Sequence, residues 1–184
     1  MPETNENFIL ISTYPGEESY TLSLFMNNAA KYGIKRAFPV GIVYDIVAES
    51  TLKGLDIRLE ANRDKDIIAS ALTLPEIKGC RFKKKEKPNF FNSSSLINTD
   101  IGEEKIVVKK LKKIKGVTED HSTYGIYDVY TKFEAKTPEK LKEIYDHKIR
   151  GIAGIRSTLE LKIINDGGFI VDEKGRIKKY PLIQ

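Results

Sequence analysis

Apolar residues in the second half of the chain switch between two spacings in a regular order. Over Ile106–Ile114 they recur every three or four positions, which is the period of an amphipathic helix. Over Ile126–Glu134 polar and apolar residues alternate, as expected of a half-buried strand. Thr137 followed by Pro138 is a typical helix start. The pattern predicts strands over 94–99, 118–123, 126–134 and 156–164, and helices that begin near 102 and 137.

The first half shows the same order of elements and shares a sequence repeat with the second. Phe8–Glu18 aligns with Ser94–Glu104, and the later pairs are Gly54 with Gly125, Asp56 with Asp128 and Gly79 with Gly154. The predicted strands are 8–14, 38–50, 55–61 and 79–85, and the predicted helices are 17–32 and 64–72.

These patterns predict an α+β protein of two tandem βαββαβ modules with antiparallel sheets. The first module comprises residues 1–88 and the second residues 89–165. Residues 166–184 are expected to form a short C-terminal β-hairpin, with strands over 169–171 and 176–180, that covers an exposed sheet edge.

Composition sets broad limits on the function. The net charge of +5 and the pI near 9.1 are mildly basic, short of the concentrated charge of a dedicated nucleic-acid binder. Cys80 is the only cysteine, so no disulfide can form within the chain, which is typical of a reducing compartment. We see no signal peptide and no apolar run approaching the ~18 residues of a spanning helix. We therefore expect a cytoplasmic protein without membrane contact.

Three stretches of the second half, taken in order, resemble a known family of regulators. They are Gly102–Val117, Gly125–Ala135 and Ile149–Thr158, which combine a helix ending in Gly-Val, a Gly-Ile-Tyr-Asp hairpin and a threonine-bearing last strand. This pattern resembles the effector-binding and oligomerisation (RAM) domain of the leucine-responsive regulator (Lrp/AsnC) family. The resemblance implies ferredoxin-like modules of the dimeric α/β-barrel type. Two departures are that the family's N-terminal helix-turn-helix has no counterpart here and that Ala153 replaces the usual proline.

The resemblance also implies a small-molecule site, with an amino acid as the family's usual effector. Asp128 could accept from an amino group, and Ser157 or Thr158 could bond a carboxylate. The other interpretation is an ordinary tight turn at Gly125, with Asp128 paired to a surface lysine. The candidate ligand-binding residues are Gly125, Tyr127, Asp128, Gly154, Ser157 and Thr158 in the second module, and Gly54 and Asp56 in the first.

We expect from this resemblance a non-catalytic effector-binding and oligomerisation protein without its own DNA-binding domain. One cysteine and two histidines leave little material for a metal site, and no cofactor is expected. The implied partners are a second copy of the chain or regulators of the same fold. The two modules of one chain could also pair with each other as a pseudo-dimer. Direct DNA binding is not expected.

Two alternatives stay open. The basic runs Arg81–Lys87 and Lys109–Lys115 could contact nucleic acid, although the second run is what the polar face of any solvated helix shows. The second alternative is a small dimeric α/β-barrel enzyme, since this fold permits catalysis. No catalytic motif supports it: His121 and His147 are expected to be surface or interface histidines, and Cys80 a small buried residue.

Overall fold

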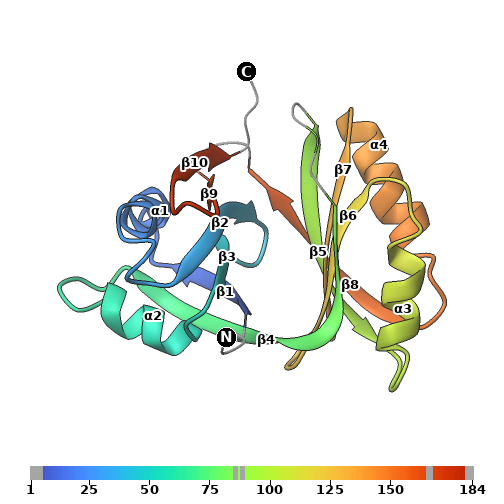
Figure 1. The fold of residues 1–184 in the computed structure, drawn as a ribbon, viewed down its shortest axis with the longest axis horizontal. Helices are drawn as coiled ribbons and strands as arrows, with labels where there is room; N and C mark the ends of the chain where they lie inside the picture. The colour runs from blue at the N-terminus through green and yellow to red at the C-terminus, as the bar shows by residue number, and fades with distance from the viewer. Residues whose placement is uncertain (1–5, 85–86, 88–89, 165–167, 181–184) are drawn as a thin grey trace. The chain divides into compact units, whose positions relative to one another are not determined.

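The computed structural model describes residues 6–84, 87, 90–164 and 168–180 (Figure 1). The chain forms two compact units, one from Met1–Pro75 with Ile163–Ile183 and the other from Glu76–Lys162. The division falls inside the long strand β4 (Ile68–Lys83), which pairs with β1 through its first part and with β6 through its second. The sequence predicts a seam at 88/89 instead, and those two residues lie outside the described ones.

The first unit packs an antiparallel sheet against α1 and α2, with strand order β10-β9-β2-β3-β1-β4. Its elements are β1 (Asn7–Thr13), α1 (Glu18–Asn27), β2 (Ile34–Gly41), β3 (Ile46–Ser50), α2 (Gly54–Ala61), β9 (Gly168–Val171) and β10 (Ile177–Tyr180). Alternate strand residues such as Ile9 and Ile11 join Phe25 and Ile57 of the helices in one core. The predicted C-terminal hairpin is present as β9 and β10, and β9 pairs with β2.

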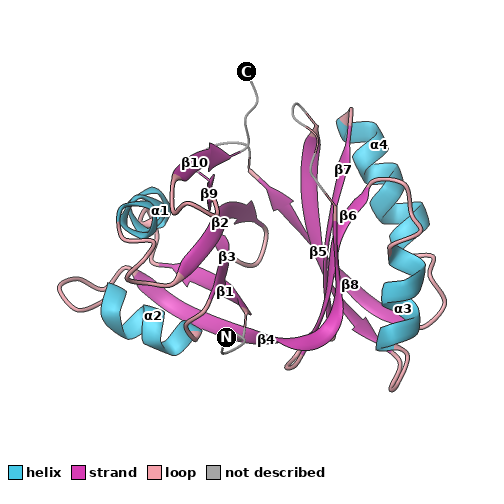
Figure 2. Ribbon diagram, viewed as in Figure 1, coloured by secondary structure: helices cyan, strands magenta, loops and turns pink. Residues whose placement is uncertain are grey.

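The second unit also has an antiparallel sheet, with strand order β4-β6-β7-β5-β8, and α3 and α4 lie on one face of it (Figure 2). Its elements are β5 (Phe91–Thr99), α3 (Glu104–Leu111), β6 (Val117–Thr123), β7 (Val129–Ala135), α4 (Pro138–Glu143), the π-helical turn η1 (Ile144–Ile149) and β8 (Ile155–Ile163). Val107 and Leu111 of α3 pack on Val129 and Phe133 of β7. No helix in the described part of the chain is long and apolar enough to cross a membrane.

The predicted α+β class with antiparallel sheets is confirmed, but several boundaries in the first half are wrong. The sequence predicts one strand over 38–50, whereas a turn between Gly41 and Ile46 divides it into β2 and β3. It predicts a strand over 55–61, whereas these residues form α2, because Gly54, Ile57 and Ala61 are buried at helical spacing. It predicts a helix over 64–72, whereas β4 already begins at Ile68.

Candidate functional site

The sheet of the second unit buries ionisable side chains on the face that its helices do not cover. Phe133 of β7 belongs to the core beneath the helices, so Tyr130 and Lys132 point to the opposite face. The strand register places His121 opposite Tyr130 and Glu119 opposite Lys132. The exposed fractions of Lys132, Glu119 and His121 are 0%, 1% and 2%. Buried charges are stable only when they are paired, so this face of the sheet is built around specific polar contacts.

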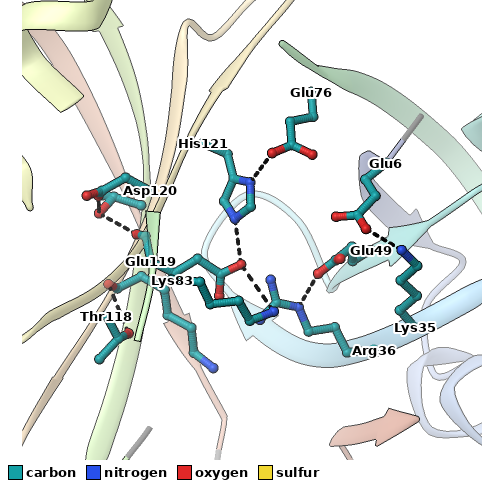
Figure 3. A network of polar contacts seen from close by, with 12 residues as sticks. Glu6, Lys35, Arg36, Glu49, Glu76, Lys83, Thr118, Glu119, Asp120 and His121 are labelled. Carbon is teal, nitrogen blue, oxygen red and sulfur yellow. Dashed lines mark hydrogen bonds and ion pairs between the residues drawn. The ribbon is translucent and has the colours of Figure 1, made fainter. Parts of the chain in front are cut away.

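His121 lies between two carboxylates (Figure 3). Its Nδ1 is 2.7 Å from Glu76 Oε1, and its Nε2 is 2.6 Å from Glu119 Oε1. Glu119 reaches the ring because residues i and i+2 of a strand share a face, and Glu76 arrives from β4, the neighbour of β6. Lys83 Nζ lies 3.7 Å from the same Glu119 oxygen. The imidazole therefore has an acceptor at each nitrogen.

These contacts decide the charge of His121. Burial on its own lowers the pKa of an imidazole, because it penalises the charged form. The hydrogen bonds to Glu119 and Glu76 outweigh burial and raise the pKa to about 9. At pH 7 the ring is therefore an imidazolium that donates one N–H to each carboxylate.

Asp120 is a second buried ionisable group, on the other face of the same strand. Its Oδ1 is 2.6 Å from Thr131 Oγ1, and its Oδ2 has no hydrogen-bond partner among the described residues. Burial raises the pKa of Asp120 to about 7, although the Thr131 hydrogen bond and the His121 charge act to lower it. Thr131 Oγ1 also lies 3.1 Å from the backbone oxygen of Glu119. A protonated Asp120 can therefore donate to Thr131, which donates onward to that carbonyl.

The structure gathers several predicted ligand-binding residues at the end of β5. Asp128 Oδ2 accepts hydrogen bonds from the backbone N–H and the hydroxyl of Thr99, at 2.7 and 3.2 Å. Ser157 Oγ accepts one from Asn98 Nδ2 at 3.1 Å. Asp128 is thus engaged with the backbone rather than with a surface lysine, while Ser157 stays exposed.

The remaining predicted residues of the second unit have local structural contacts. Gly125 and Gly154 have φ angles of +132° and +98°, a region that glycine adopts without strain. The hydroxyl of Thr158 is 3.0 Å from that of Tyr145 in η1. The backbone oxygen of Tyr127 accepts a hydrogen bond from the last threonine of β6 at 2.8 Å.

The first unit repeats the aspartate arrangement with Asp45, not with Asp56. Asp45 Oδ2 accepts from the backbone N–H and hydroxyl of Thr13 at 2.7 and 3.1 Å, as in the second unit. The alignment of Gly54 and Asp56 with the second-unit hairpin is therefore wrong. Those two residues lie in the first turn of α2, where Asp56 is exposed.

Asp128→Ala and Asp45→Ala should each lower the free energy of unfolding by about 1.5–3 kcal/mol, because each removes a carboxylate that accepts two hydrogen bonds from a strand end. Urea unfolding followed by circular dichroism measures the loss. Asp56→Ala removes an exposed aspartate and should stay within about 0.5 kcal/mol of the wild type. If Asp128→Ala were as stable as the wild type, the structural role of this carboxylate would be refuted.

The sequence interpretation missed His121 as an engaged residue and expected a surface or interface histidine. One signal was available, since Glu119 and His121 at i and i+2 of a predicted strand share a face. Glu76 gave no such signal, because it lies 45 residues away in the sequence. In the described ranges, no group of three or more His, Cys, Asp or Glu side chains is placed to hold a metal ion.

No protein-family model and no curated protein sequence matches this chain. Among solved structures, it is 31% identical to FFRP-DM1 over 40% of this chain and 99% of that one, with a TM-score of 0.39. The matched part of this chain belongs to the Lrp/AsnC family. This match agrees with the family resemblance noted in the sequence.

Two further structures show that the Lrp/AsnC-like fold of this chain also occurs in enzymes. The siroheme decarboxylase NirDL matches 86% of this chain and 70% of its own, at 12% identity and a TM-score of 0.67. An anthrone oxidase-like protein matches 89% of this chain and 92% of its own, at 7% identity and a TM-score of 0.53. The prediction that the chain is not an enzyme is contradicted by these structures, because the absence of a sequence motif does not exclude catalysis on this fold.

Proposed function

We propose that this chain is an acid–base enzyme of the dimeric α/β-barrel type and that His121 is its proton donor. The proposal rests on the buried imidazolium that Glu76 and Glu119 hold between them. Ionisable groups with strongly perturbed pKa values occur preferentially at functional sites. The likeness of the fold to a decarboxylase and to an oxidase-like protein supports a catalytic role for such a group.

Both ring N–H groups already have acceptors, so a substrate must take the place of one carboxylate. The side chain of Glu76 is 9% exposed and that of Glu119 only 1%. Glu76 is therefore the group that an anionic substrate displaces from Nδ1. Glu119 then keeps Nε2 and fixes the orientation of the ring, as the carboxylate partner of a catalytic histidine does.

The raised pKa of His121 keeps the ring protonated at neutral pH before the substrate binds, so the ring holds a proton that it can give to a carbanion. In a decarboxylation, the bond between the carboxylate and its neighbouring carbon breaks, CO2 leaves, and the electron pair stays on that carbon. His121 would donate its Nδ1 proton to this carbon, and solvent would then reprotonate the ring. Siroheme is the substrate to test first, because the decarboxylase with the similar fold acts on it.

The purified chain should release CO2 from siroheme under anaerobic conditions, as measured by mass spectrometry of the tetrapyrrole. His121→Gln keeps an N–H donor but has no proton to transfer, so the rate should fall at least about 100-fold. His147→Gln changes an exposed histidine of η1 and should keep the wild-type rate. Near-ultraviolet circular dichroism checks that both variants are folded. An unchanged tetrapyrrole with the wild-type chain, or an unchanged rate in His121→Gln, would refute the proposal.

Effector binding at the end of β5 is a second proposed function. The exposed hydroxyl of Ser157 favours it. Ser157 accepts a hydrogen bond from Asn98, and the next residue of β5, Thr99, makes the contact with Asp128. An amino acid bound at 100 times its dissociation constant should add about 2.7 kcal/mol of stability in a thermal-shift screen. Ser157→Ala should abolish this gain without touching Asp128. A screen in which no amino acid raises the Tm contradicts this second function.

We also propose that the chain is a tandem pair of RAM-like modules. The same order of elements in both units and the matching aspartate contacts of Asp45 and Asp128 support the duplication. We include in this proposal that the chain associates with further copies of itself as a homo-oligomer. Light scattering measures its mass in solution.

A further inference from the structure

The second unit contains a cavity of about 650 Å3 that is surrounded by lysine side chains. The lysines come from separate segments: Lys84 and Lys87 after β4, Lys115 before β6, Lys136 after β7, Lys140 in α4 and Lys148 in η1. Among the lining residues that the structure describes, only Glu134 and Glu143 are acidic. Six lysines against two glutamates make the cavity strongly cationic, which favours an anionic ligand.

Acidic side chains neutralise little of this charge. Glu143 pairs with Lys148 at 3.3 Å. Glu134 Oε2 accepts the backbone N–H of Lys87 at 2.9 Å and so is directed to the main chain. Within the described residues, the lysines that precede β6, follow β7 and lie in α4 have no acidic partner within salt-bridge distance. Several ammonium groups are therefore available to a ligand.

Gly116 brings the lysine-bearing segments together. It has a φ of +107°, and a Cβ at this position would lie 2.5 Å from Ile144 Cδ1 and 2.9 Å from the backbone oxygen of Glu134. The turn between α3 and β6 therefore lies directly against the end of β7 and the start of η1. Lys136 directly follows β7 and Lys148 lies in η1, so this close packing of the backbone places both lysines around the same cavity as Lys115.

The cavity also has an aromatic and apolar side. Phe90 is half-buried in its wall, and Lys87 Nζ lies 5.1 Å from the centre of the Phe90 ring. Val117, Ala135 and Ile144 line the cavity as well. A flat aromatic face beside a group of ammonium ions offers stacking for a base and charge for phosphates.

We propose that this cavity binds a nucleoside diphosphate or triphosphate, with its phosphates among the lysines and its base against Phe90. The volume lies within the range of small-molecule sites. Lysine ammonium groups are mobile point charges that suit phosphate oxygens. The lysines surround a cavity, whereas a nucleic-acid strand would need a stripe of charge along the surface. The site is separate from His121 and does not depend on the proposed catalysis.

Isothermal titration of the full chain with ATP, tripolyphosphate and adenosine tests this site. ATP should bind more tightly than either fragment. Lys136→Ala with Lys140→Ala should weaken ATP binding at least about tenfold, because two charge-assisted contacts are lost. Lys109→Ala with Lys112→Ala removes the same charge from lysines that do not line the cavity, and should change the affinity less than about twofold. Phe90→Ala should weaken ATP binding and leave tripolyphosphate binding unchanged.

Absence of ATP binding by the wild-type chain would overturn the proposal. An equal loss in the two double variants would do the same, because it would show attraction to net charge alone. Tripolyphosphate binding as tightly as ATP would remove the nucleoside from the proposal. Binding of single-stranded oligothymidine that ATP cannot displace would assign the lysines to nucleic acid instead.

Discussion

Replacing His121 by leucine should lower the free energy of unfolding at pH 7 by about 3–5 kcal/mol, because it leaves two carboxylates facing each other without the cation between them. Glu76 and Glu119 lie 2.7 and 2.6 Å from the two ring nitrogens, and the ring is buried. Leucine fills much of the same volume, so the loss measures the missing charge more than a cavity. Urea unfolding at pH 7, followed by circular dichroism, gives the difference.

The pH dependence of the same pair of proteins gives a second readout. The folded pKa of His121 is raised to about 9 from an ordinary value of 6.5. A raised pKa means that the folded state binds the proton more tightly, so the stabilisation is complete below about pH 6.5 and is lost as the pH rises through 9. The full contribution is about 3 kcal/mol. Above about pH 8, where Asp120 is already ionised, the wild type should therefore lose stability as the pH rises, and His121→Leu should not.

A second substitution separates charge from packing. In His121→Leu with Glu76→Leu, one of the two carboxylates that flank the imidazole in the wild type is also removed, so part of the lost stability should return. Glu119 keeps its contact with Lys83 in this variant. A double variant that is less stable than His121→Leu would show that the imidazolium does not hold Glu76 by charge.

Local signals explain why the second half of the chain was the easier one to predict. Its helices have clear apolar stripes, and Thr137 with Pro138 begins α4 as expected, with the Thr137 side chain accepting from the backbone N–H of Lys140. In the first half, Leu55 and Leu59 are 60% and 66% exposed on α2. Apolar residues on the exposed side of a helix remove the helical spacing of its apolar positions. The sequence of 55–61 therefore predicts a strand.

The candidate site could be predicted only in part, because one of its contacts depends on how two strands pair. The side chains of Glu119 and His121 share a face because they are two residues apart in one strand. The partner at the other nitrogen depends on how β4 pairs with β6, and the register shifts between Glu76 and Arg81. A β-bulge of this kind moves side chains from one face to the other and has no reliable sequence signature.

Asp120→Asn should raise the free energy of unfolding at pH 8 by roughly 2–4 kcal/mol and leave it nearly unchanged at pH 4. Burial raises the pKa of Asp120 to about 7 from 3.8, so the folded state favours the protonated acid. The stability that this gives is complete below about pH 3.8 and is lost as the pH rises through 7, where the buried carboxyl ionises. Asparagine is neutral at every pH and has the same shape. Thermal unfolding across pH 4–9 compares the two proteins.

The hydrogen bonds around Asp120 can accommodate the amide. The asparagine NH2 can donate to Thr131 Oγ1, which still donates to the backbone oxygen of Glu119, and the amide oxygen takes the place of the unpartnered Oδ2. Ser122→Ala is the matched control, since Ser122 has a buried hydroxyl without a partner among the described residues. This control should change stability by less than about 1 kcal/mol at any pH. An Asp120→Asn protein that is less stable than the wild type at pH 8 would mean that the folded protein stabilises the carboxylate. The loss of stability above pH 4 would then need another source.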